Sequence, residues 1–119
     1  MAPAEAEENL GLGCPPIPVI EGVHSKVYDA VTQPAALDMG SWHTCETTHC
    51  RAGWVVTLAG EAGKKLEAFH NTDLAARLIY AASDPGFQIN PARFHDSNTA
   101  ALDDMKRLAE AEAAKSENP

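Results

Sequence analysis

Residues 42–54 read W-H-T-C-E-T-T-H-C-R-A-G-W and hold most of the chemically distinctive side chains of the sequence. Two of the three cysteines, two of the five histidines and both tryptophans lie within them. Thr47 and Thr48 are of a residue type that caps helices by accepting a hydrogen bond from a free backbone N–H. Because apolar residues then recur at helical spacing, we expect a central helix from Thr47 or Thr48 to about Ala59.

The sequence on either side of this helix also has helical periodicity. Apolar residues spaced for one helix face predict short helices over 21–32, 61–69 and 73–82, and a last helix capped by Ser97 or Asn98. With 119 residues, the chain has the length of one domain. The predicted fold class is all-α, a single small domain of four to five short helices preceded by an extended proline-containing arm.

Four segments follow from this pattern. We expect a flexible acidic arm over 1–13, an extended proline-rich segment over 14–20, the helical domain over 21–112 and a flexible tail over 113–119. The second segment reads C-P-P-I-P-V-I, and its three prolines exclude a helix. Its apolar side chains should lie along a surface, either of this domain or of a neighbouring subunit. These candidate partner-binding residues are Ile17, Val19 and Ile20.

The composition limits the partners and the location. Nine basic residues stand against 17 acidic ones, a net charge of −8, which argues against direct contact with nucleic-acid phosphates. No run approaches the roughly 18 apolar residues that span a bilayer, so we expect no membrane contact. Residues 1–10 lack the basic and apolar regions of a secretory signal, which favours the cytoplasm or a virion assembled there. An odd number of cysteines argues against a full disulfide framework.

His43, Cys45, His49 and Cys50 are candidate ligands for zinc, which prefers imidazole and thiolate in tetrahedral sites. The spacing is a weak match, because one short segment would supply every ligand and adjacent helical residues diverge by about 100°. A tetrahedral site is geometrically easier to form from His43, Cys45 and either His49 or Cys50, with a histidine distant in sequence as the fourth ligand. The candidates for that ligand are His24, His70 and His95.

Two other interpretations apply to the same residues. Near a helix N-terminus, the pKa of the Cys50 thiol would be lowered and Cys45 could be its redox partner, although C-x4-C is not the usual C-x-x-C spacing. Nucleophilic catalysis lacks a third, orienting group. The interpretation we favour is packing, with Cys50 beside Trp54 and the histidines hydrogen-bonded across the loop.

Three glycines, Gly53, Gly60 and Gly63, recur at helical spacing. Glycine costs roughly 1 kcal/mol relative to alanine inside a helix, so its repeated use predicts close approach by another part of the backbone. Gly60 is also a candidate helix break.

The segments 37–39, 42–63, 78–80 and 101–105 together resemble small uncharacterised proteins encoded by bacterial and phage genomes. The likeness spans roughly Ile17 to Glu112 and centres on a W-H-x-C-x-T-x-H-C-R-A-G-W motif. It implies a virion component or a small phage accessory protein, and it carries over no catalytic residue.

The sequence therefore favours a non-enzymatic phage- or prophage-associated protein that acts through protein–protein contacts, with a protein partner or by self-assembly. One alternative is a small zinc-binding module centred on Cys45 and Cys50; no other cofactor is expected. A second alternative is an acidic inhibitor of a host nucleic-acid-binding protein.

Overall fold

The computed structural model describes residues 15–117, so the predictions for 1–13 and for Cys14 concern residues outside this range. Five α-helices account for most of the described chain: α2 (Val23–Val31), α3 (Arg51–Leu58), α4 (Gly60–Phe69), α5 (Thr72–Ser83) and α6 (Asn98–Glu117). Two short strands, β1 (His43–Cys45) and β2 (Thr48–His49), form a hairpin, and a 3₁₀ helix, η1 (Pro91–His95), precedes α6. The all-α prediction is confirmed.

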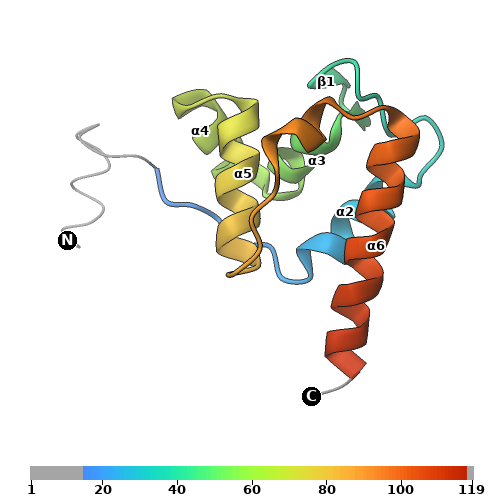
Figure 1. Cartoon of the computed structure of the whole chain (residues 1–119). Coiled ribbons are helices and arrows are strands. Elements are labelled where there is room, and N and C mark those ends of the chain that lie inside the picture. Colours follow the sequence, from blue (N-terminus) through green and yellow to red (C-terminus); the bar gives the residue numbers. More distant parts are fainter. Residues whose placement is uncertain (1–14, 118–119) are drawn as a thin grey trace.

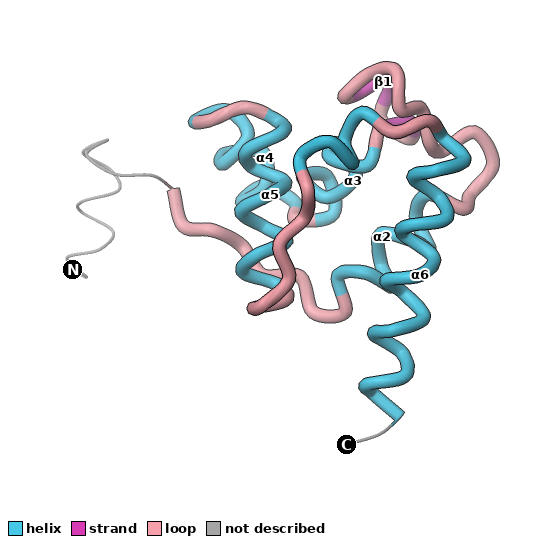
Figure 2. Tube along the Cα trace, viewed as in Figure 1, coloured by secondary structure: helices cyan, strands magenta, loops and turns pink. Residues whose placement is uncertain are grey.

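Helix α3 lies at the centre of the domain (Figure 1). It packs against α2 on one side and against α4 and α5 on the other, while α6 runs along α2. The hairpin sits at the end of the molecule where α3 begins, and the long connections of the domain are those that follow α2 and α5 (Figure 2). The core is built mainly from aliphatic side chains of these helices, among them Val23, Val27, Val55, Val56, Leu66, Ile79 and Met105.

The central helix begins later than its sequence predicts. Thr47 and Thr48 do not cap it, because 43–49 form the hairpin and the Thr48 hydroxyl donates to the Ala35 carbonyl at 2.7 Å. Cys50 is the cap instead, and its Sγ accepts a hydrogen bond from the Gly53 N–H at 3.3 Å. The prediction failed because partners distant in sequence, the carbonyls of 35–36, hold the threonine segment in an extended form.

The glycine predictions are confirmed. Gly60 has φ +67° and is the first residue of α4, so the break between α3 and α4 lies at 59–60. A methyl group at Gly53 would overlap the Trp42 carbonyl oxygen, and one at Gly63 would overlap the Val56 carbonyl oxygen. Both glycines therefore allow a close approach that no other residue permits.

Helix α2 has no capping side chain of its own, since Gly22 precedes it in a left-handed conformation. Glu112 of α6 takes that role, because its carboxylate accepts from the backbone N–H of Ser25 at 2.9 Å and of His24 at 3.2 Å. Burial alone would raise the pKa of Glu112, but these hydrogen bonds lower it below its ordinary value. A negative charge also suits the positive end of the helix dipole.

Helix α6 continues through Glu117, so residues 113–117 are helical where the sequence predicts a flexible tail over 113–119. Residues 113–117 are good helix formers apart from Ser116, and they extend a helix that is already nucleated. None of the helices in residues 15–117 combines the length and the hydropathy that crossing a bilayer requires.

Candidate functional site

The hairpin brings two histidine rings together. The strands pair antiparallel with His43 opposite His49, and the ring centroids lie 4.8 Å apart in a nearly perpendicular arrangement. The two Nδ1 atoms face each other at 2.7 Å. His49 is buried, whereas about a third of the His43 side chain is exposed. The two histidine side chains thus meet across the hairpin, as the packing interpretation expects.

The other nitrogen of each ring also has a partner. His43 Nε2 lies 2.6 Å from Glu67 Oε2 of α4, and the Thr72 hydroxyl donates to the same carboxylate oxygen at 2.6 Å. His49 Nε2 donates to the backbone carbonyl of Glu46 at 2.9 Å. A continuous hydrogen-bonded chain thus fixes the hairpin to α4 and to the start of α5.

Cys45 lies at the exposed end of β1. Hydrogen bonds from Thr48 and Thr47 lower the pKa of its thiol to about 7. A substantial fraction of Cys45 is therefore thiolate at neutral pH, the form that binds metals and attacks electrophiles.

Cys50 has the opposite character. It is buried, and although its sulfur accepts the Gly53 N–H, desolvation outweighs that hydrogen bond and raises the pKa of the thiol. The hypothesis of a redox thiol at position 50, activated by the helix N-terminus, is wrong for this reason. Cys50 packs in the core as a small apolar side chain, as the packing interpretation expects.

A groove of about 690 Å³ opens between the hairpin, α3 and α4. Its walls include His43, Cys45, Glu46, Lys64 and Glu67, and His49 lies at its base. All of these residues except Lys64 carry side-chain atoms that can ligate a metal. Nevertheless, no group of three or more His, Cys, Asp or Glu side chains within residues 15–117 is already arranged around one metal position.

The remaining histidines named from the sequence do not join the hairpin pair. His24 pairs with Asp84, the His95 ring lies 6.2 Å from that of Trp42, and His70 packs against Phe69. The residue distant in sequence that contacts the pair is Glu67 instead of a histidine. It accepts a hydrogen bond from the His43 ring.

Next to the hairpin, Arg51 opens α3 with its side chain fully buried. Its Nε donates to the Tyr80 hydroxyl at 2.9 Å and its Nη1 to the Asp104 carboxylate at 2.7 Å. Burial raises the pKa of Tyr80. Burial would also raise the pKa of Asp104, but the hydrogen bonds from Arg107 and Arg51 outweigh it and lower the pKa of this carboxyl group. A neutral phenol and an ionised carboxylate thus hold a buried guanidinium in place.

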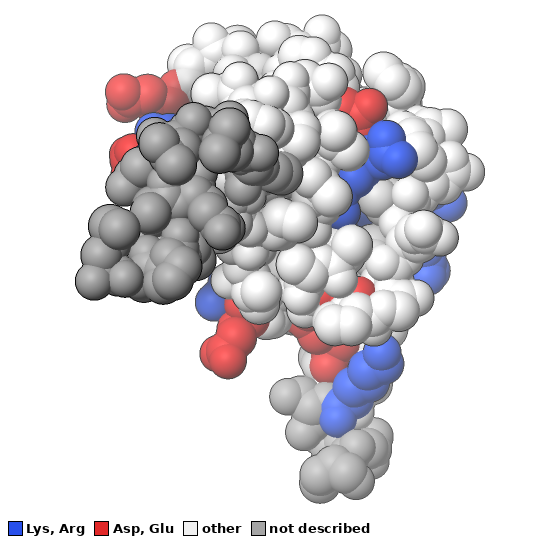
Figure 3. All heavy atoms as spheres, turned by 90° about the vertical axis from the view of Figure 1, so that its left-hand side faces the viewer, with Lys and Arg blue, Asp and Glu red and all other residues white. Residues whose placement is uncertain are grey.

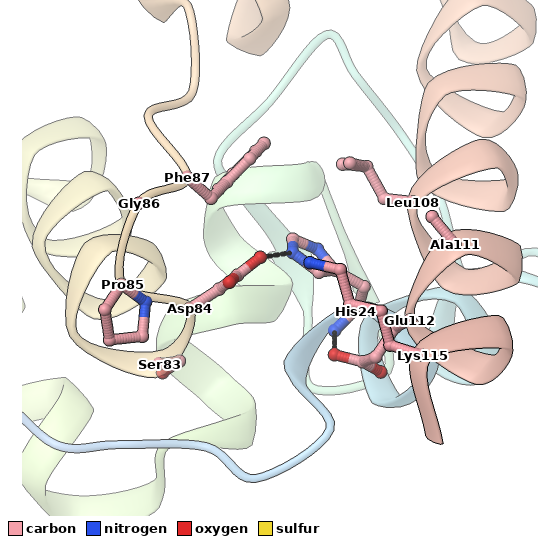
Figure 4. A pocket seen from close by; sticks show the side chains of 10 residues that line it. All are labelled: His24, Ser83, Asp84, Pro85, Gly86, Phe87, Leu108, Ala111, Glu112 and Lys115. Atoms are coloured by element: carbon pink, nitrogen blue, oxygen red, sulfur yellow. Dashed lines mark hydrogen bonds and ion pairs between the residues drawn. The ribbon is translucent and has the colours of Figure 1, made fainter. Parts of the chain in front are cut away.

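A second groove, of about 440 Å³, lies where the start of α2, the turn after α5 and the end of α6 meet (Figure 4). His24 Nε2 is 2.9 Å from the Asp84 carboxylate, and the imidazole stacks on Tyr80 and meets Phe87 edge to face. Sequence reasoning missed this pair, because 60 residues separate its members. An Asp-Pro-Gly turn after a helix is the only local signal at Asp84.

Comparisons with protein-family models, with curated proteins and with solved structures found no match for the chain.

Proposed function

We propose that the protein acts through protein–protein contacts, as a phage- or prophage-associated structural or accessory component rather than as an enzyme. The phage association derives from the sequence resemblance centred on residues 42–54. The contact role is supported by one observation in particular, the exposure of apolar side chains on the extended segment 15–20.

This segment is anchored to the domain at Ile20. Ile20 is buried in the core of its own domain, and its N–H donates to the Ser83 hydroxyl at 2.9 Å. Just before it, Val19 is 62 % exposed and Ile17 is 39 % exposed. Ile20 is therefore occupied within its own chain, and the partner-binding proposal now concerns Ile17 and Val19.

The chemistry of the segment favours packing by side chains. Pro16 and Pro18 have no backbone N–H and keep the chain extended, so strand addition would lack donors. An extended chain with exposed aliphatic side chains can instead lie in an apolar groove of another copy, at little cost in conformational entropy because the prolines already restrict it. The contact that we propose is therefore one of side-chain packing, and the partner that we propose is a second copy of this chain.

The side of the molecule on the left in Figure 1 is consistent with a contact of this kind. In the space-filling view of that side, uncharged residues cover most of the described surface, and the charged ones form separate small groups (Figure 3). Lys and Arg make no continuous basic stripe in this view, so it offers no obvious track for a phosphate backbone.

Sedimentation velocity over a wide concentration range tests the proposal. We expect the wild-type chain to self-associate, and Ile17→Ser/Val19→Ser to remain monomeric with an unchanged far-ultraviolet circular dichroism spectrum. Phe69→Ser is the matched control, because it removes another exposed apolar side chain, at the end of α4. A wild-type chain that is monomeric at every concentration, or a double variant that associates like wild type, contradicts the proposal.

A further inference from the structure

The hydrogen bonds around the two hairpin histidines determine where their hydrogens lie. The Glu46 carbonyl can only accept, so His49 Nε2 carries a hydrogen. Glu67 Oε2 already accepts from the Thr72 hydroxyl, and as a carboxylate it also accepts from His43 Nε2 at 2.6 Å. Each imidazole therefore carries a hydrogen on Nε2 and donates it to a group outside the pair.

This arrangement leaves the inner nitrogens without hydrogens in the neutral rings. Two Nδ1 lone pairs would then face each other at 2.7 Å, a distance at which they repel unless a positive charge lies between them. The pair is thus a preformed place for a cation, and a proton is the smallest cation that satisfies it.

The surroundings favour a larger cation. Metal-binding histidines typically donate their other ring N–H to a carboxylate or a backbone carbonyl, and His43 and His49 do so to Glu67 and Glu46. The pair adjoins the groove of about 690 Å³, which gives access from solvent. Gly53 keeps the position clear, because a methyl group there would lie 3.1 Å from His43 Nδ1.

We propose that His43 and His49 bind a divalent transition metal such as zinc through their Nδ1 atoms, with Glu67 and the Glu46 carbonyl orienting the rings. At zinc–nitrogen distances of about 2.0–2.1 Å, tetrahedral ligands lie about 3.3 Å apart. The rings must separate by roughly 0.6 Å from their 2.7 Å contact, a shift that small side-chain rotations supply.

Only two protein ligands converge, so the site differs from a closed four-ligand structural centre. The remaining positions adjoin the groove and are open to water or to the Cys45 sulfur, which lies two residues along β1 from His43. Cys50 takes no part, since its sulfur is buried and caps α3. The proposal thus replaces Cys50 with Glu67 in the set of residues that determine binding.

Zinc chloride, titrated into the purified full chain in competition with a chromogenic chelator, tests the proposal. We expect one zinc ion per wild-type chain, and binding at least tenfold weaker in His43→Gln and in His49→Gln. His95→Gln is the matched control, because it removes an exposed imidazole from η1, and it should bind zinc like wild type. Glu67→Gln leaves both ligands in place and should weaken binding by about 10- to 100-fold.

Nitrogen-detected imidazole spectra separate a metal from a proton. On addition of zinc, the Nδ1 signals of His43 and His49 should shift while both rings keep the Nε2–H form. A site that holds a proton only would show no change with zinc, and a zinc stoichiometry well below one per chain would agree with it; either result overturns the proposal. Binding that survives His43→Gln and His49→Gln but is lost in Cys45→Ser overturns it as well. Because Glu67→Gln alters no ligand, it keeps the test decisive if a histidine variant unfolds.

Discussion

Two polar networks flank Cys50, and they are built in opposite ways. On one side, Arg51 is buried and its positive charge is matched by the Asp104 carboxylate. On the other, His43 and His49 turn two like nitrogens toward each other beside an open groove. The first network has its charges paired within the protein, whereas the second is the one that we propose takes a cation from outside. A polar cluster that opens onto a groove and lacks an internal counterpart is the better candidate for binding.

The largest expected effect comes from removing the buried charge. Arg51→Met leaves Asp104 and Tyr80 without their guanidinium partner in the core, so the free energy of unfolding should fall by about 3 kcal/mol. Urea denaturation measures it. Arg107→Met removes an exposed partner of the same carboxylate and should cost less than about 1 kcal/mol. Equal losses in the two variants would remove the distinction between buried and exposed partners of Asp104.

Gly53→Ala tests the junction between the networks. The added methyl group would overlap the Trp42 carbonyl oxygen, so the hairpin must shift, and we expect a loss of about 1–2 kcal/mol together with weaker zinc binding. Gly63→Ala causes a comparable overlap with the Val56 carbonyl oxygen inside the helical core. It should cost similar stability and leave zinc binding unchanged. If both variants bind zinc like wild type, the close approach at Gly53 has no part in the site.

Acid should weaken the Arg51 network in particular. Because the pKa of Asp104 is lowered in the folded state, its contribution is complete above the ordinary aspartate range and is lost as pH falls through the lower folded value. We expect wild-type stability to decline as the pH falls below the ordinary aspartate range, because Asp104 loses its contribution there. Asp104→Asn should be less stable at pH 7 and show a shallower decline. An unchanged slope would assign the acid sensitivity to other carboxyl groups, with Glu112→Gln as the comparison.

The smallest effect concerns the two thiols, and it involves no change in stability. Cys45 is exposed and its pKa is about 7, so its alkylation by iodoacetamide should reach half its maximal rate near pH 7. Cys50 should stay unmodified in the folded protein, because it is buried and its pKa is raised. Peptide-level mass spectrometry distinguishes the cysteines. Alkylation of Cys50 at the rate of Cys45 would show that the helix cap opens readily.

Local patterns in the sequence predicted the helices well. The apolar spacing in 73–82 and the Asn71 side chain, which accepts from the Leu74 N–H, are sufficient to place α5. The hairpin was not predictable in this way, because Thr47 and Thr48 are equally suited to cap a helix and to extend into a strand. Their state is determined by carbonyl groups at 35–36, which are distant in sequence.

The same limit applies to the candidate site. His43 and His49 were named correctly as partners, but nothing in the local sequence of α4 distinguishes Glu67 from any solvated glutamate. The buried network did leave a signal. Asp104 lies within the apolar stripe of α6, three residues after Ala101, and a carboxylate on a buried helix face requires a buried positive charge. Arg51 could have been sought on that basis.

The cap that Glu112 provides has a consequence for the order of folding. During synthesis α2 leaves the ribosome early, yet the carboxylate that accepts from its first N–H groups is 87 and 88 residues further along. A nascent chain that ends before α6 therefore holds α2 with its first turn uncapped. We expect this helix to acquire its final stability only as synthesis of the domain nears completion, and folding to be slowed by the long loop that this contact closes.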